Sequence, residues 1–168
     1  MIASLLTPET LTLDNVPRLA DVEQLIRILG NHGVDYSVNG RREAQDSAYA
    51  RTINFTAGRI VDTTAPYELV STMRASFWVI GPLLARMGEA KVSLPGGCAI
   101  GTRPVDLFIE GLKALGADIE IESGYAVART RRGLAGNRYV FPKVSVGATH
   151  VMMMAAALGT GPVADAFY

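Results

Sequence analysis

The only cysteine of the chain, Cys98, lies in the glycine-rich segment SLPGGCAIGTRPVD, residues 93–106. Pro95-Gly96-Gly97 cannot readily continue a strand or a helix, so the thiol is expected on a turn. A helix predicted to begin near Pro104 would bring free backbone N–H groups and a positive dipole end close to Cys98, and Arg103 adds a full charge. These groups would lower the pKa of the thiol and attract an anion such as phosphate. The segment therefore predicts a reactive thiol beside an anion site; the plainer alternative is a small buried hydrophobic residue.

Several other chemistries do not fit the sequence around Cys98. The segment lacks the Gly-Lys-Ser/Thr ending of a Walker loop and the G-x-G-x-x-G pattern of dinucleotide sites. The two histidines, His32 and His150, are both distant in sequence, which disfavours a Cys-His protease pair and a zinc site. A thiol-based redox or signalling protein is disfavoured because the chain has no resolving cysteine. We expect no metal and no organic cofactor.

Composition places the chain among ordinary globular proteins. It has 168 residues, of which 49% are hydrophobic and 19% are charged. Lysine and arginine balance aspartate and glutamate, so the net charge is zero and the overall field would not attract nucleic acid. The pairs Arg41-Arg42 and Arg131-Arg132 are interpreted as solvated loop residues.

Cysteine content and hydropathy indicate a cytoplasmic protein. A single cysteine cannot form an internal disulfide, which favours a reducing compartment. The N-terminal residues MIASLLTPET do not have the pattern of a signal peptide. The most apolar stretch, residues 146–159, is too short to span a bilayer and contains His150. We therefore expect neither membrane nor nucleic-acid partners.

Short strands and helices alternate along the chain, which predicts an α/β fold of the α+β type. Strands are predicted at residues 10–16, 34–40, 51–58, 90–97, 117–124, 125–130 and 137–141, and helices at 16–33, 65–88, 103–116 and 146–159. Gly81-Pro82 should break or kink the second of these helices.

The pattern of one helix returns 83 residues later. Val22, Leu25, Ile26, Leu29 and Gly33 correspond to Val105, Phe108, Ile109, Leu112 and Gly116. Each set is followed by a Gly-Val-Asp or Gly-Ala-Asp step into a strand. This echo predicts repeated strand-helix units within one domain, at about residues 9–88 and 89–142, with a third unit beginning near residue 143.

Three segments carry a resemblance to a known family. APYELVSTMRASFWVIGPLLAR, VSLPGGCAIGTRPVDLFIEGLKALGA and FPKVSVGAT occur in the order found in bacterial UDP-N-acetylglucosamine 1-carboxyvinyltransferases (UDP-N-acetylglucosamine enolpyruvyltransferases). The similarity runs from about residue 3 to residue 161. The Cys98 loop distinguishes this family from its relative, the shikimate-pathway enolpyruvyltransferase.

The resemblance implies an activity and a fold. The family transfers enolpyruvate from phosphoenolpyruvate to the 3′-hydroxyl of UDP-N-acetylglucosamine, the first committed step of peptidoglycan synthesis, without metal or cofactor. Its fold is a pair of inside-out α/β barrel domains, each built from three units. This chain would hold two complete units and the start of a third.

The resemblance also implies roles for individual residues. Cys98 would act in proton transfer at the enolpyruvyl carbon and be the thiol that fosfomycin alkylates, and Arg103 would lie near the phosphate of phosphoenolpyruvate. The residues implied at the UDP-sugar are Arg74, Arg103, Pro104, Val105, Asp106, Leu107, Lys143, Val144, Ser145, Val146 and Gly147. Taken alone, Arg74, Asp106 and Lys143 could equally be ordinary surface charges.

The chain also departs from the family, whose members are more than twice as long. The Lys-Asn pair that contacts phosphoenolpyruvate and the whole second domain have no counterpart here. We expect the isolated chain to be inactive, because losing even one positioned transition-state contact costs about 3 kcal/mol. Uncovered apolar faces predict self-association or a covering partner. The alternative function is a stand-alone UDP-sugar binding module.

Overall fold

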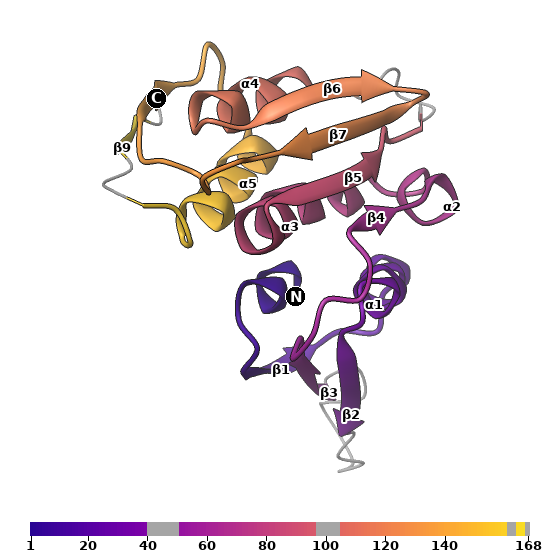
Figure 1. Ribbon diagram of the computed structural model, residues 1–168. Helices are drawn as coiled ribbons and strands as arrows, with labels where there is room; N and C mark the ends of the chain where they lie inside the picture. The colour runs from indigo at the N-terminus through magenta and orange to yellow at the C-terminus, as the bar shows by residue number, and fades with distance from the viewer. Residues whose placement is uncertain (40–50, 97–104, 161–163, 167–168) are drawn as a thin grey trace.

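The computed structural model describes residues 1–39, 51–96, 105–160 and 164–166. The N-terminal part of the chain forms a small antiparallel sheet. Its strands are β1 (Thr10–Val16), β2 (Asp35–Asn39) and β3 (Arg51–Thr56), in the order β1-β3-β2 (Figure 1). Side chains alternate along them, so that Ile53 and Phe55 are fully buried while threonine and asparagine side chains form hydrogen bonds on the exposed face. Helix α1 (Ala20–Asn31) connects β1 to β2.

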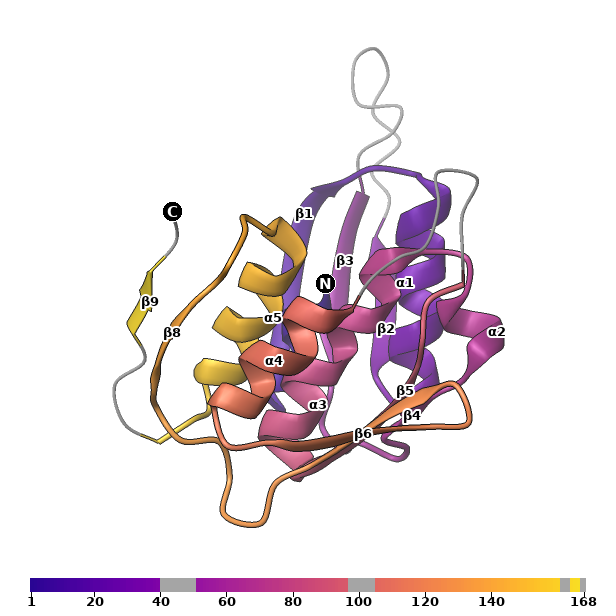
Figure 2. The same cartoon turned by 90° about the horizontal axis from the view of Figure 1, so that it is seen from above.

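A second, four-stranded sheet carries the helices that form the larger part of the core. Its strands are β4 (Thr64–Ala65), β5 (Glu89–Ser93), β6 (Asp118–Glu122) and β7 (Tyr125–Arg129), in the order β4-β5-β7-β6, with β4 parallel to β5. Helices α3 (Ile80–Met87) and α4 (Asp106–Ala114) pack on one face of this sheet, and α5 (Val146–Ala156) packs against both of them (Figure 2). Strands β8 (Arg138–Val140) and β9 (Ala164–Ala166) form a separate parallel pair. The predicted mixed α/β fold is confirmed, and the described residues form no closed barrel.

Arg86 connects helix α3 to the N-terminal part of the chain by hydrogen bonds. The guanidinium of this α3 residue donates to the Leu5 carbonyl at 3.0 Å and to the Ala57 carbonyl at 2.7 Å. Leu5 belongs to the 3₁₀ helix η1 (Ile2–Leu6), which was not predicted, and Ala57 directly follows β3. One side chain thus connects α3 both to η1 and to the end of β3.

The helix predicted over residues 65–88, with a break or kink at Gly81-Pro82, is divided into three. The chain forms α2 (Tyr67–Val70), the 3₁₀ helix η2 (Arg74–Val79) and then α3, so one interruption precedes Arg74 and the change from η2 to α3 falls directly before Gly81-Pro82. Pro82 lies in the first turn of α3, where its missing N–H removes no bond of that helix. Gly81 is required for a different reason. A Cβ atom on it would lie 2.8 Å from the Val151 carbonyl oxygen, so α3 and α5 can pack this closely only at glycine.

The helices that carry the 83-residue echo end in the same way. Gly33 after α1 and Gly116 after α4 adopt positive φ values of 88° and 92°. The amide of Val34 donates to the Leu29 carbonyl and the amide of Ala117 to the Leu112 carbonyl, the long hydrogen bond of a Schellman ending. The sheet orders β1-β3-β2 and β5-β7-β6 also correspond. The repeat boundaries at 9–88, 89–142 and 143 stay predictions.

His32, at the C-terminal end of α1, is a fully buried histidine. Its Nδ1 donates to the Asp62 carbonyl oxygen at 2.7 Å, and its Nε2 is buried without a hydrogen-bond partner in the described part of the chain. Burial lowers the pKa of His32 below its ordinary value of 6.5, while the Asp62 carbonyl and carboxylate oppose that shift. The folded protein therefore favours the neutral imidazole.

Acidification should consequently weaken the fold through His32. The unfolded chain takes up this proton as the pH falls below 6.5, before the folded chain does, so the free energy of unfolding should decrease from pH 7.5 to pH 5.5. One proton contributes a slope of at most about 1.4 kcal/mol per pH unit. Urea unfolding at several pH values measures it. His32→Leu, which places at position 32 the residue type of the buried Leu115, 83 positions later, should flatten the slope. Equal slopes in the original chain and His32→Leu would contradict the assignment.

Across the residues whose placement is described, no helix has both the length and the apolar character needed to cross a membrane.

Candidate functional site

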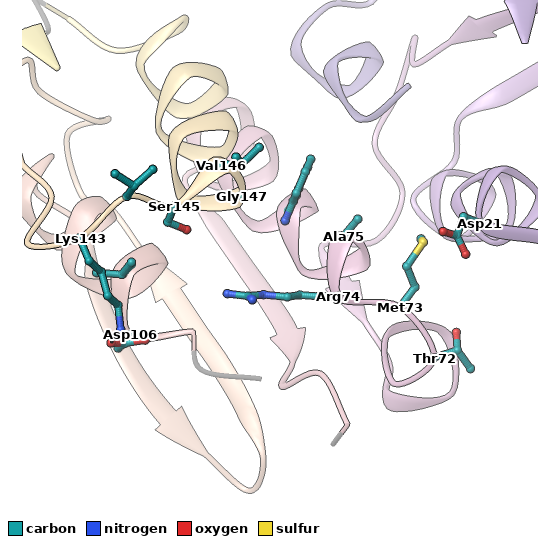
Figure 3. A pocket seen from close by; sticks show the side chains of 13 residues that line it. Asp21, Thr72, Met73, Arg74, Ala75, Asp106, Lys143, Ser145, Val146 and Gly147 are labelled. Carbon is teal, nitrogen blue, oxygen red and sulfur yellow. Dashed lines mark ion pairs between the residues drawn. The ribbon is translucent and has the colours of Figure 1, made fainter. Parts of the chain in front are cut away.

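A pocket of ≈ 810 Å³ opens where the N-terminal ends of α1 and α5 approach η2 and α4 (Figure 3). Four separate parts of the chain line it: one residue of α1, the segment around η2, the start of α4 and the segment that leads into α5. The lining residues are Asp21, Thr72, Met73, Arg74, Ala75, Trp78, Asp106, Leu107, Lys143, Val144, Ser145, Val146 and Gly147.

Most of the residues predicted at the UDP-sugar meet in this pocket. They are Arg74, Asp106, Leu107, Lys143, Val144, Ser145, Val146 and Gly147. Val105 is half-buried at the N-cap of α4 and does not line the pocket. Cys98, Arg103 and Pro104 lie outside the described residues. Residues 74, 106–107 and 143–147 are remote in sequence, so only the tertiary packing brings them together.

Arg74 is the first residue of η2, and its side chain extends into the pocket (Figure 3). Its guanidinium carbon lies 5.6 Å from the centroid of the Phe108 ring, within the range of a cation–π contact. A guanidinium presents several donors in a planar fork, which suits a carboxylate or a phosphate.

A second cation faces Arg74 from the other side of the pocket. Lys143 Nζ lies 3.8 Å from the Asp106 carboxylate, and the two side chains are 62% and 50% exposed. Such an exposed pair is weak, because water screens both charges. The Lys143 ammonium can therefore exchange this partner for an anionic ligand at little cost.

The N-terminal end of α5 adds a partial positive charge to the same wall. Ser145 is its N-cap, and the serine Oγ accepts from the Ala148 amide at 3.3 Å. The amides of Val146 and Gly147 in the first turn have no acceptor within the helix, as at every helix start. Together with the helix dipole they favour an anion at this end of the pocket.

Gly147 allows this helix end to approach the floor of the pocket. A Cβ atom there would lie 3.0 Å from Phe108 Cζ and 3.1 Å from Trp78 Nε1. Trp78 Nε1 is itself buried without a hydrogen-bond partner among the described residues. A larger residue at position 147 would therefore require Phe108 or Trp78 to shift by a few tenths of an ångström.

Five lining residues were not predicted from the sequence: Asp21, Thr72, Met73, Ala75 and Trp78. Met73 and Ala75 flank Arg74 in the segment TMRAS, so their proximity could have been inferred. Trp78 is one 3₁₀ turn further along η2. Asp21 had no local signal, because α1 reaches the pocket only through tertiary packing.

The chain belongs to the family described as EPSP synthase (3-phosphoshikimate 1-carboxyvinyltransferase), whose sequence model matches residues 1–165. Within that class of protein, the resemblance to UDP-N-acetylglucosamine 1-carboxyvinyltransferases is confirmed. The chain is 81% identical over 162 residues to UDP-N-acetylglucosamine 1-carboxyvinyltransferase 1 of Mesorhizobium japonicum, and 79% identical over 161 residues to the UDP-N-acetylglucosamine 1-carboxyvinyltransferase of Brucella ovis. Each alignment covers 96% of this chain and 38% of the relative, so the chain spans less than half of the length of these curated relatives.

Solved structures share the fold at low sequence identity. The enolpyruvyl transferase NikO from Streptomyces tendae superposes with a TM-score of 0.74 at 16% identity, covering 95% of this chain and 35% of that one. EPSP synthase from Acinetobacter baumannii gives a TM-score of 0.71 at 17% identity, covering 98% of this chain and 39% of the other. These similarities establish the enolpyruvyl transferase fold for this chain.

Proposed function

We propose that the chain forms the UDP-sugar side of an enzyme that transfers enolpyruvate from phosphoenolpyruvate to the 3′-hydroxyl of UDP-N-acetylglucosamine, in peptidoglycan synthesis. One observation carries this proposal. Three remote segments that resemble the UDP-sugar-binding segments of that family line a single pocket with two cationic side chains and a helix N-terminal end. The high identity to relatives of that name supports the choice of substrate.

The charges in the pocket suit a nucleoside diphosphate sugar. We assign the diphosphate to the region between Arg74, Lys143 and the first turn of α5, where a guanidinium, an ammonium and backbone N–H groups converge. Asp106 would then exchange its weak contact with Lys143 for a hydroxyl or N–H donor of the ligand, since a carboxylate is an acceptor.

The phosphoenolpyruvate side of the site is assigned by resemblance. Arg103 would hold the phosphate of phosphoenolpyruvate, and Cys98 would act in proton transfer at the enolpyruvyl carbon and be the thiol that fosfomycin modifies. In the net reaction the 3′-oxygen forms a bond to C2 of phosphoenolpyruvate, the C2–O bond to phosphate breaks, and inorganic phosphate leaves with the hydroxyl proton. No metal or cofactor is needed to balance this exchange.

The wider architecture is part of the same proposal. We propose that the three sheets belong to an inside-out α/β barrel built from repeated units, and that the protein acts in the cytoplasm. The 168 residues by themselves should not turn over substrate, because they span 38% of the relatives' length and closure between domains excludes water in such enzymes. Exposed apolar residues such as Val144 (78%) and Met153 (56%) would be covered by a second domain or by self-association.

An NMR titration of the labelled 168-residue chain with UDP-N-acetylglucosamine tests the proposal. Amide shifts are expected at Arg74, Asp106, Leu107 and residues 143–147, with weak affinity for a partial site. Lys143→Ala should weaken binding roughly tenfold, the order of one charge-assisted contact. Lys113→Ala is the matched control, because Lys113 is exposed in the last turn of α4 and does not line the pocket.

The same sample also tests the pocket assignment and the expected lack of turnover. A well-dispersed spectrum without shifts at millimolar UDP-N-acetylglucosamine would overturn the assignment of the pocket. Phosphate release from phosphoenolpyruvate in the presence of the sugar nucleotide should stay at background for the 168-residue chain. Turnover by this chain would disprove the requirement for further domains and would exclude the stand-alone binding module.

A further inference from the structure

Phe108 lies beneath the pocket and contacts two of the elements that form it, although it does not line the pocket itself. The side chain comes from α4 and is fully buried. Its ring lies 5.6 Å from that of Phe77 on η2, with an interplanar angle of 78°, and a Cβ atom on Gly147 of α5 would lie only 3.0 Å from its Cζ. The position of this ring is therefore closely constrained.

Arg74 also contacts this ring. Arg74 and Phe77 are three residues apart on η2, and both approach Phe108. The edge-to-face contact with Phe77 holds the orientation of the Phe108 ring. The guanidinium carbon of Arg74 lies over that ring at 5.6 Å from its centroid, where the negative π-face attracts a cation.

We propose that Phe108 is a positioning residue, which holds the Arg74 guanidinium in the orientation that meets an anionic group of the nucleotide sugar. This inference rests on the proposed function of the pocket. Phe108 acts through Arg74 rather than by touching the ligand. An aliphatic side chain of similar size would preserve most of the packing, but it would remove the π-face that attracts the cation.

The variant Phe108→Leu tests this role through ligand affinity. UDP-N-acetylglucosamine should bind about 2- to 5-fold more weakly, the factor expected from losing one partly exposed cation–π contact. Phe55→Leu is the matched control: it removes an equally buried ring, on β3, that does not line the pocket, and it leaves the Phe77–Phe108 pair in place beneath Arg74. Its affinity should stay closer to that of the original chain.

A double-mutant cycle with Arg74→Ala distinguishes positioning from general loosening of the core. If Phe108 acts through Arg74, then Phe108→Leu should have no further effect on affinity once Arg74 is absent. An unchanged affinity in Phe108→Leu, or an equal loss in both backgrounds, would overturn the proposal.

A measurement without ligand separates this proposal from the function on which it rests. The Arg74 Nε–Hε resonance should carry a ring-current shift that Phe108→Leu removes and Phe55→Leu largely retains. If the original chain bound no sugar nucleotide, the proposed function would fail and the ligand-orienting role with it. The ring-current shift would still show whether Phe108 holds Arg74, and its absence would refute the contact itself.

Discussion

Phe77→Ala is expected to lower the free energy of unfolding by about 3–5 kcal/mol, the usual cost of truncating a fully buried phenylalanine. Phe77 is completely inaccessible to solvent and packs edge-on against Phe108, so its loss would leave a cavity between η2 and α4. Domains of this size are stable by only about 5–15 kcal/mol. The variant should therefore unfold at a markedly lower urea concentration than the original chain, as measured by urea denaturation followed by circular dichroism.

The matched control for this prediction is Tyr36→Ala. Tyr36 is an aromatic residue on the edge strand β2, and 53% of its surface is exposed. Its truncation should cost less than about 1 kcal/mol, since little apolar surface is lost from the core. Similar losses for the two variants would show that η2 and α4 do not form the closely packed contact described above.

The second large effect is expected on ligand binding. Arg74→Ala should weaken the affinity for UDP-N-acetylglucosamine about 10- to 100-fold, because it removes a charge-assisted contact to an anion. The affinity of Arg74→Lys should fall between those of the original chain and Arg74→Ala, since an ammonium keeps the charge but loses the planar fork of donors. Isothermal calorimetry or the NMR titration would measure these affinities.

Arg132→Ala provides the comparison for the loss of one positive charge. Arg132 is exposed and lines a different hollow, formed where β5, β6 and β7 meet the turn after Arg129. Its removal changes the net charge by the same amount but should leave the affinity within about twofold, because Arg132 does not line the ligand pocket and salt screens exposed charges. If Arg132→Ala and Arg74→Ala weakened binding equally, the ligand would be responding to net charge and not to the pocket.

Much of the local structure follows from the sequence alone. The alternation in TLTLDNV predicted the strand that became β1, and the glycines at positions 33 and 116 predicted where two helices end. These features depend on side-chain period and on the φ values that glycine tolerates, which are properties of a few neighbouring residues. The segments around Arg74, Cys98 and Lys143 likewise led to a family resemblance that the comparisons confirm.

The meeting of distant residues was decided only by the tertiary structure. The interruption before Arg74 places that residue at the start of η2, although the local pattern favoured one long helix broken later. The close packing of α3 and α5 at Gly81, and of α5 against Phe108 at Gly147, sets how near Lys143 and the start of α5 come to Arg74. Asp21 and Trp78 join the pocket in the same way. Periodicity specifies which face of an element is apolar, but the position of one element against another depends on how side chains from remote segments fit together.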